Sequence, residues 1–478
     1  MRKGIWLAIG MLALVNVGAL GAAARPAGAA AGRATVTQEH QKDVAVTIYN
    51  GNLGLVKDLR ELTLGPGTHE VKFMDVAAQI DPTTVHLKSL TDPAGVRILE
   101  QNYEYDLLNP QKLLDKFVGK TVKLMVGDGS LIDAELLSNN NGPIYRINGQ
   151  IHLGHYGRVI LPDLPGNLIP KPTLVWLLQN RTGRVQRIEA SYLTGGITWK
   201  ADYVVVLNAQ DNGGDVSGWV TVDNKSGATY ADAALKLVAG DVNRARTRRE
   251  MRDALGAVAE APAAKSAAQF QQEAFFEYHL YSLEGRTTIK DNQMKQISLL
   301  DAAEVPMKKE LRFYGASQYY RSQWGTPISN QKVSVFLEIA NTEQHHLGIP
   351  LPKGTVRVYK AAADRSLQFI GEDLIDHTPK DEKVKIKMGE AFDVVGERTQ
   401  RDWRKIASNV YETEWDVQLR NHKKEDVEVT IIEPVPGDWE VVRTSHPYEK
   451  IEAHTLQYVV KVPKDGKVTV NYRVRMRW

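Results

Sequence analysis

The sequence contains few residue patterns that predict a chemical reaction. The G-x-S-x-G elbow of serine hydrolases, the H-E-x-x-H zinc motif, the Walker phosphate loop and the G-x-G-x-x-G dinucleotide motif are all absent. The chain has no cysteine, which excludes thiol nucleophiles, disulfides and cysteine-based metal sites. A Ser-His-Asp triad stays open, because its members need not be neighbours in the chain. The sequence predicts no catalytic residue, no metal site and no cofactor.

Two histidine pairs are the nearest approach to a metal-binding pattern. His152 and His155 lie three residues apart, which places them on opposite faces of a strand unless Gly154 turns the chain. His345 and His346 are adjacent in a predicted turn. We interpret the first pair as residues of a barrel rim and the second as exposed turn residues, with a metal site as the alternative for each.

An acidic and aromatic cluster precedes the first predicted helix. Glu104 and Asp106 alternate with Tyr103 and Tyr105. Two carboxylates beside aromatic rings are what a glycosidase site needs, and this is the alternative interpretation. We favour solvated carboxylates on a strand whose tyrosines pack on the core.

The richest aromatic stretch interleaves rings with arginines, and it is the predicted ligand-binding site. Aromatic faces stack on sugar rings, and guanidinium groups bind carboxylates or phosphates. Such a site would suit an envelope polysaccharide or a partner protein. The alternative is a hairpin whose aromatics fill a sandwich core. The residues are Arg312, Phe313, Tyr314, Tyr319, Tyr320, Arg321 and Trp324.

The elements that position these residues are predicted to be strands. Apolar residues alternate with polar ones in short runs, and turn residues recur every eight to twelve positions. This pattern predicts a mainly β, multi-domain β-sandwich of immunoglobulin-like character with few short helices. The β regions are expected at 44–108, 173–242 and 278–478, after a flexible lead at 25–43.

Residues 109–165 predict a small inserted barrel of the SH3-like or Sm-like kind. Asn109 and Pro110 are good N-cap and first-turn residues for a helix that Gly119 ends. Four or five short strands separated by glycine turns follow, and a proline-rich linker leads back to the second β region. We do not extend this likeness to RNA binding, because a net charge of only +3 argues against nucleic acid as a partner.

Residues 243–277 interrupt the strand pattern and predict a mobile excursion rich in arginine and alanine. The functional alternative is a basic patch that contacts a membrane surface peripherally. Its arginines are Arg244, Arg246, Arg248, Arg249 and Arg252.

Two further patterns support sandwich construction. A strand ends at an asparagine in three places, at Asn224, Asn341 and Asn421, where the side chain can close its own turn. In the last strand, Tyr472, Val474, Met476 and Trp478 share one face, with arginines on the other. We interpret it as a final sandwich strand, with the terminal strand of an outer-membrane barrel as the alternative.

The first 24 residues have the form of a signal peptide. Arg2 and Lys3 precede an apolar run of about 16 residues, which is shorter than the roughly 20 that a spanning helix needs. Small residues follow, and Ala22 with Ala24 fits a cleavage site before Arg25. Export to the periplasm or cell surface is expected, and without cysteine the protein cannot be a lipoprotein. An uncleaved anchor is the alternative.

Several segments resemble one exported bacterial family. They are VTIYNGNLGLVKDLR at 46–60, residues 73–77 and 80–83, GGITWKADY at 195–203, LPKGTVRVY at 351–359, and much of 403–472. The chain is similar to the family of domain of unknown function 4139, which is distantly like the mucoidy-inhibitor-A proteins. The resemblance implies an exported, mostly β protein, and it implies no activity.

The sequence therefore favours a non-enzymatic protein of the cell envelope that binds or scaffolds an envelope polymer or a partner protein. A hydrolase acting on envelope polysaccharide or peptide is the first alternative. An outer-membrane-associated component is the second.

Overall fold

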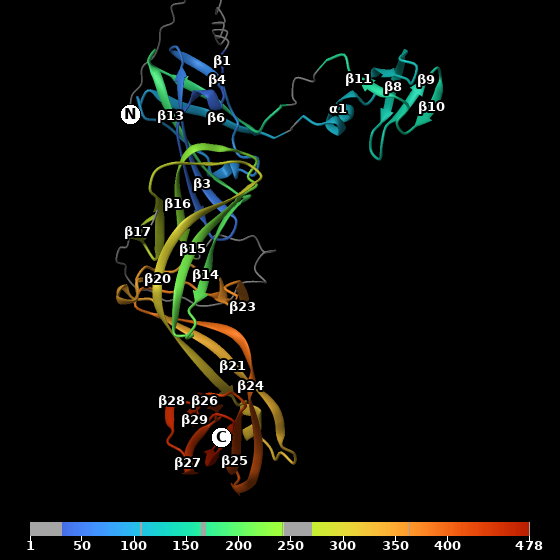
Figure 1. Ribbon diagram of the computed structural model, residues 1–478. Helices are drawn as coiled ribbons and strands as arrows, with labels where there is room; N and C mark the ends of the chain where they lie inside the picture. Colours follow the sequence, from blue (N-terminus) through green and yellow to red (C-terminus); the bar gives the residue numbers. More distant parts are fainter. Residues whose placement is uncertain are drawn as a thin grey trace, which may run out of the picture.

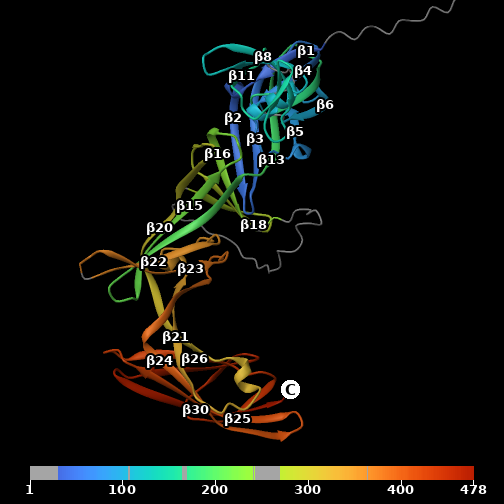
Figure 2. The same cartoon turned by 90° about the vertical axis from the view of Figure 1, so that its right-hand side faces the viewer.

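The computed structural model describes residues 31–105, 108–163, 169–240, 242, 270–362 and 364–477. These residues form a mainly β, multi-domain sandwich, as predicted. Three sandwich units follow one another from the N-terminal unit at the top to the C-terminal unit at the bottom of Figures 1 and 2. No helix within the described ranges is long and apolar enough to cross a membrane.

The N-terminal unit packs a four-stranded sheet on one half of an eight-stranded sheet. Phe73 and Trp176, on neighbouring strands of the four-stranded sheet, meet edge to face in its core, with ring centroids 5.1 Å apart. The four-stranded sheet has the order β1 (Gly32–Val36), β4 (Gly67–Met74), β12 (Thr173–Asn180), β6 (Val96–Glu104). The facing half contains β2 (Gln41–Tyr49), β3 (Leu53–Thr63), β13 (Val185–Thr194) and β5 (His86–Ser89).

The eight-stranded sheet continues into the middle unit through β16, which pairs in parallel with β2. The strands of this second half are β16 (Tyr230–Ala239), β17 (Phe270–Phe275), β18 (Tyr278–Leu283) and β19 (Thr287–Ile289). The opposing layer contains β14 (Ile197–Leu207), β15 (Gly213–Asn224), β22 (Gly354–Ala361), β23 (Leu367–Ile375) and the first part of β20 (Gln293–Tyr314). One continuous hydrophobic core therefore serves the N-terminal and middle units.

The C-terminal unit shares a sheet with the middle unit, because β20 and β24 are long enough to contribute residues to both units. β20 has 22 residues, which span roughly 70 Å at about 3.3 Å each. The first layer contains β21 (Ile328–Ala340), β24 (Lys383–Ala407), β25 (Val410–Asn421), β30 (Gly466–Arg477) and β27 (Asp438–Thr444). The second contains β26 (Val427–Pro434), β29 (Thr455–Val462) and β28 (Glu449–Glu452).

The last strand has the two faces that the sequence predicts. The side chains of Tyr472, Val474 and Met476 are fully buried in the core of the C-terminal unit. Arg473 and Arg475 lie on the outer face and pair with Glu412 and with other acids of the neighbouring strands. β30 is thus a sandwich strand between β25 and β27, while Trp478 lies outside the described residues.

The asparagine turns are also confirmed. Asn421 accepts a hydrogen bond from the backbone N–H of Lys423 and donates to the carbonyls of Glu425, Val462 and Pro463. Asn224 and Asn341 close their turns in the same way. Asn180 is a fourth instance that the sequence analysis missed, and it joins its own turn to the carbonyls of residues 64 and 65. Each amide ties a strand end to a neighbouring segment.

The inserted module differs from the expected barrel. Asn109 caps α1 (Pro110–Phe117) by accepting from the N–H of Lys112, and a five-stranded antiparallel sheet follows. Its order is β10 (Gln150–Leu153), β9 (Ile144–Ile147), β8 (Leu131–Ser138), β7 (Thr121–Met125), β11 (Arg158–Ile160). The two end strands do not pair with each other, so the described sheet stays open. The module stands to one side of the N-terminal unit in Figure 1.

The lead expected at 25–43 is ordered over its described part. β1 pairs in parallel with β4, the short 3-10 turn η1 (Gln38–His40) follows, and β2 begins at Gln41. The segment looked unstructured because its side chains are polar. An edge strand needs only its backbone to pair, and here only Val36 is buried. The predicted signal peptide and Arg244 to Arg252 lie outside the described residues.

Candidate functional site

The predicted aromatic stretch lies at the start of the C-terminal unit, and the structure divides it into a buried part and a surface part. Phe313, near the end of β20, and Tyr320, in the 3-10 turn η3 (Ser317–Tyr320), are fully buried in the core. Tyr319 and Trp324 are half-buried, and their rings meet edge to face at 5.2 Å. The core interpretation therefore describes Phe313 and Tyr320.

The three other residues of the stretch reach the surface to different degrees. Arg312 is half-buried because it donates to Glu310 at 2.9 and 2.5 Å and lies over the ring of Phe336. Tyr314 is 42% exposed, and Arg321 is exposed after η3. Tyr314 and Arg321 are thus the members of the stretch most open to a ligand.

The buried part of the stretch surrounds an ion pair in the core. Arg398 donates to Oε1 of Glu433 from Nη2 at 2.8 Å and from Nε at 3.1 Å, and both side chains are 1% exposed. The hydroxyl of Tyr320 donates to the other oxygen of Glu433 at 2.9 Å and lies 2.7 Å from the hydroxyl of Tyr472. Burial, together with the charge of Glu433, raises the pKa of Tyr320 well above its ordinary value, so this tyrosine stays neutral.

The same construction occurs in the N-terminal unit. Arg60 pairs with Asp58 at 2.7 Å and lies over the ring of Phe73 at 3.8 Å. In the C-terminal unit, Arg398 likewise lies over the ring of Phe313 at 4.0 Å. Two cores of this chain therefore contain the same packing arrangement, in which an arginine pairs with a carboxylate and stacks on a phenylalanine ring. The surface next to the second arrangement is the better place to look for a ligand.

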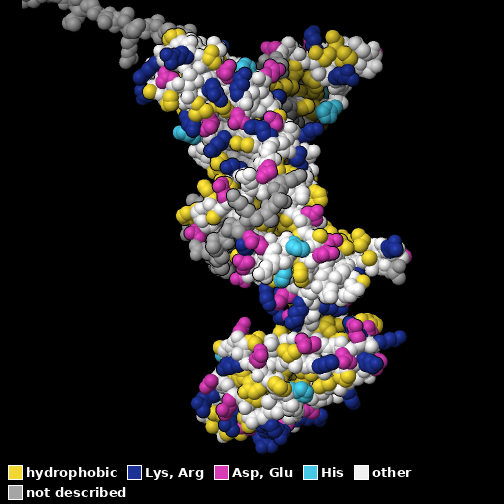
Figure 3. Space-filling view, turned by 60° about the vertical axis from the view of Figure 1, so that its left-hand side comes forward, with side chains coloured by type: hydrophobic (Ala, Val, Ile, Leu, Met, Phe, Trp, Pro, Cys, Tyr) yellow, Lys and Arg dark blue, Asp and Glu magenta, His cyan; other side chains and the backbone are white. Residues whose placement is uncertain are grey.

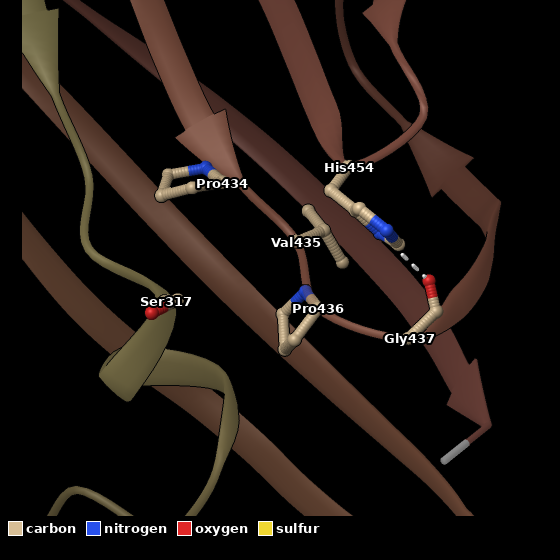
Figure 4. Close-up of a pocket in the computed structure, with 6 residues that line it drawn as sticks. All are labelled: Ser317, Pro434, Val435, Pro436, Gly437 and His454. Atoms are coloured by element: carbon tan, nitrogen blue, oxygen red, sulfur yellow. Dashed lines mark hydrogen bonds between the residues drawn. The ribbon is translucent and has the colours of Figure 1, made fainter. Parts of the chain in front are cut away.

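That surface contains a shallow depression between η3 and the loop after β26 (Figure 4). Its volume is about 270 Å³, and most of its lining is apolar. Figure 4 shows Ser317 on one side, His454 on the opposite side, and the two prolines between them. The lining residues are Ser317, Pro434, Val435, Pro436, Gly437 and His454.

The chain fixes this depression through its local sequence. The two prolines restrict the backbone that follows β26, and Val435 between them is fully buried. Nδ1 of His454 lies 3.1 Å from the carbonyl oxygen of Gly437, which can only accept, so Nδ1 carries the proton and donates. Nε2 is the other polar atom of the ring. The result is a small, mostly apolar hollow whose lining residues include two polar side chains, this imidazole and Ser317.

The depression suits binding better than acid–base chemistry. Figure 4 draws no hydrogen bond between Ser317 and His454, and the six lining residues include no carboxylate to orient an imidazole. A hollow of about 270 Å³ lined by proline and valine matches one large apolar side chain of a partner. On the face of the C-terminal unit that Figure 3 shows, basic and acidic side chains are interspersed.

The other candidate clusters do not assemble into sites. His152 packs edge to face against Tyr156 at 4.7 Å, and His346 bonds to the carbonyl of Ala303. Tyr103 and Tyr105 stack on each other at 5.7 Å, while Asp106 lies outside the described residues. Within the part of the chain that the structure describes, no three histidine, aspartate or glutamate side chains gather as metal ligands would.

Sequence reasoning missed the residues of the depression. Their one local signal is the run Glu433-Pro-Val-Pro-Gly437, in which prolines follow a strand. His454 lies 17 residues further on and Ser317 more than a hundred residues earlier, and no spacing in the sequence connects them.

Comparison with known proteins identifies a family. A family model described as domain of unknown function (DUF4139) matches residues 188–478, which is more than half of the chain. No curated protein matches the chain.

Proposed function

The chain belongs to the family of domain of unknown function 4139, and we propose that it is an exported, non-enzymatic binding protein that scaffolds a partner protein in the cell envelope. The partner contact in this proposal is the depression at η3. The family description assigns no activity, so the proposal rests on the molecule itself.

The observation that carries the proposal is the chemistry of the depression. Two prolines and a valine offer apolar contact, and the imidazole of His454 and the hydroxyl of Ser317 are the polar side-chain groups among the lining residues. Sugars need several converging hydrogen-bond donors and acceptors, which this lining does not provide. An apolar or aromatic side chain with one donor group, such as tyrosine or tryptophan, fits both the size and the polarity. A protein partner is therefore favoured over a polysaccharide.

The architecture supports a scaffolding role. One sheet is shared by the N-terminal and middle units, and another is shared by the middle and C-terminal units. Shared sheets resist bending at the junctions, because a hinge would break ladder hydrogen bonds. The depression of the C-terminal unit is thereby held at a set distance from the N-terminal unit. The signal-peptide-like sequence at 1–24 supports a location of the protein outside the cytoplasm.

The test is photo-crosslinking in the native cell, followed by fractionation. A photo-reactive amino acid at position 318, next to the depression, should capture a protein in the envelope fraction. Ser317→Trp fills the depression and should reduce capture by at least about tenfold. Gln318 is exposed on the same turn but does not line the depression, so Gln318→Trp, with the photo-reactive residue moved to position 321, is the matched control.

Equal capture by the Ser317→Trp protein and the control would refute the contact. Recovery of the full-length protein from the cytosol would refute export. A crosslinked product that contains glycan and no protein would show that the partner class is wrong.

A further inference from the structure

The hairpin between β17 and β18 lies at the flank of the middle unit (Figure 1), and its tip contains two phenylalanines. Phe275 pairs with Tyr278, so only Phe276 and Glu277 form the loop. The side chain of Phe276 is 84% exposed and that of Phe275 is 58% exposed. Two adjacent phenylalanine side chains that are exposed to water at a turn are unfavourable, because burying their apolar surface would lower the free energy. This tip is remote in the fold from the depression of the C-terminal unit.

The backbone at the tip is strained as well. Phe276 has φ of 57°, in the left-handed region. Two-residue hairpin loops with positive φ at the first position strongly prefer glycine there, because a Cβ is disfavoured in that conformation. A bulky aromatic residue at such a position is an outlier, and strained residues of this kind concentrate where a molecule makes contacts. Folding alone would be served better by glycine.

The neighbouring packing holds the strained ring in place. The ring of Tyr278 lies against the backbone of Gly240, where an added Cβ would overlap it. The ring of Phe276 then lies 6.2 Å from that of Tyr278. Gly240 directly follows β16, so the end of this strand contacts Tyr278, and Tyr278 in turn contacts Phe276. These contacts restrict the conformation of Phe276, so that it loses less conformational entropy when it binds a partner.

The charge of the hairpin indicates what it meets. Residues 270–285 contain three acids, Glu273, Glu277 and Glu284, and no lysine or arginine. An anionic lipid surface would repel such a hairpin. A protein with an apolar pocket rimmed by lysine or arginine would attract it, and complementary charge would also guide the approach. Charge and shape therefore favour the same class of partner.

We propose that Phe275 and Phe276 form an anchor that inserts into an apolar, basic-rimmed pocket of a partner protein. The contact is separate from the one at η3 and does not depend on it. Phe276 enters the pocket as the leading side chain, Phe275 packs beside it, and the acids face the basic rim.

The test compares stability with capture in the full chain. A photo-reactive amino acid replaces Glu273, two residues from the tip, and the crosslinked product is mapped by mass spectrometry. Phe276→Gly should leave the melting temperature equal or higher, because it relieves the backbone, and should reduce capture at least tenfold. Phe392, which is 91% exposed on β24, provides the matched control Phe392→Gly, which should leave capture unchanged.

Three results would overturn the proposal. The first is capture that survives Phe276→Gly, or no crosslinked protein at all. The second is a crosslink that maps to a polar or acidic surface of the partner. The third is flotation of the purified protein with phosphatidylcholine or phosphatidylglycerol vesicles that is lost in Phe276→Gly, which would make the tip a membrane contact. Support requires loss of capture, retained stability and a mapped pocket with lysine or arginine at its rim.

Discussion

Replacing Glu433 by glutamine leaves the guanidinium group of Arg398 in the core without its counter-charge. Both side chains are 1% exposed, so water cannot take the place of the lost carboxylate. Removing one partner of a buried ion pair typically lowers the free energy of unfolding by about 3–5 kcal/mol. For a unit of this size each kcal/mol lowers the melting temperature by about 2–4 °C, so the transition of the C-terminal unit should fall by roughly 6–20 °C.

The double variant Arg398→Met with Glu433→Leu removes both charges, and so separates the effect of one unpaired charge from the effect of losing the ion pair. Apolar residues of similar volume avoid the unpaired charge, so the double variant should lose less stability than Glu433→Gln alone. Glu397→Gln is the matched control, because Glu397 pairs with Arg420 at 3.5 Å where both side chains are partly solvated. It should cost less than about 1 kcal/mol.

Guanidinium chloride unfolding, followed by tryptophan fluorescence, measures these differences. The ring of Trp415 lies 6.3 Å from that of Tyr320, so its emission should follow loss of the network. The reasoning would be refuted if Glu433→Gln cost less than 1 kcal/mol. It would also fail if the double variant lost as much as the two single changes together, because the charges would then be uncoupled.

Three further substitutions test other interactions in the C-terminal unit. Asn421→Ala removes a buried amide with four hydrogen bonds and should cost about 2–4 kcal/mol in chemical unfolding, whereas a loss under 0.5 kcal/mol would contradict its structural role. Gly396→Ala should cost about 1–3 kcal/mol, because the new methyl group overlaps the Phe313 ring, and a crystal structure with that ring unmoved would contradict this. Burial raises the pKa of Glu414, but hydrogen bonds from Asn471 and two arginines lower it by more, so the pKa lies below its ordinary value. The ionised carboxylate therefore stabilises the fold at neutral pH. That contribution should disappear as the pH falls below about 4.3, and melting curves of Glu414→Gln should depend less on pH in this acid range than those of the unmodified protein.

Much of the fold could be predicted from the sequence because local patterns determine it. Alternation of apolar side chains identifies the strands, as in β30, where every second residue from Tyr472 is buried. An asparagine after a strand marks a turn whose hydrogen bonds are mostly local, as at Asn421. Local patterns do not determine whether a small sheet closes, since that depends on two end strands meeting. β10 and β11 of the inserted module do not meet, and the expected barrel is an open sheet.

The candidate site could not be predicted in the same way, because its parts come together only through tertiary contacts. Ser317 and His454 lie more than a hundred residues apart in the chain, and each alone looks like an ordinary turn residue. Within the aromatic stretch, Tyr320 is buried and Tyr314 is exposed, although their residue type is the same. Tyr314 ends β20 on the face opposite to buried Phe313, whereas Tyr320 lies in η3 and is packed into the core by its tertiary contacts.

The shared sheets have a practical consequence for anyone who isolates part of the chain. The region matched by the family model begins at residue 188, inside β13, and so excludes β2 and β3. A fragment that starts there would lose the parallel partner of β16 and expose the backbone of a strand that is internal in the whole protein. Such an open edge pairs readily with other chains, so the fragment should aggregate, whereas a chain that begins before β1 should not.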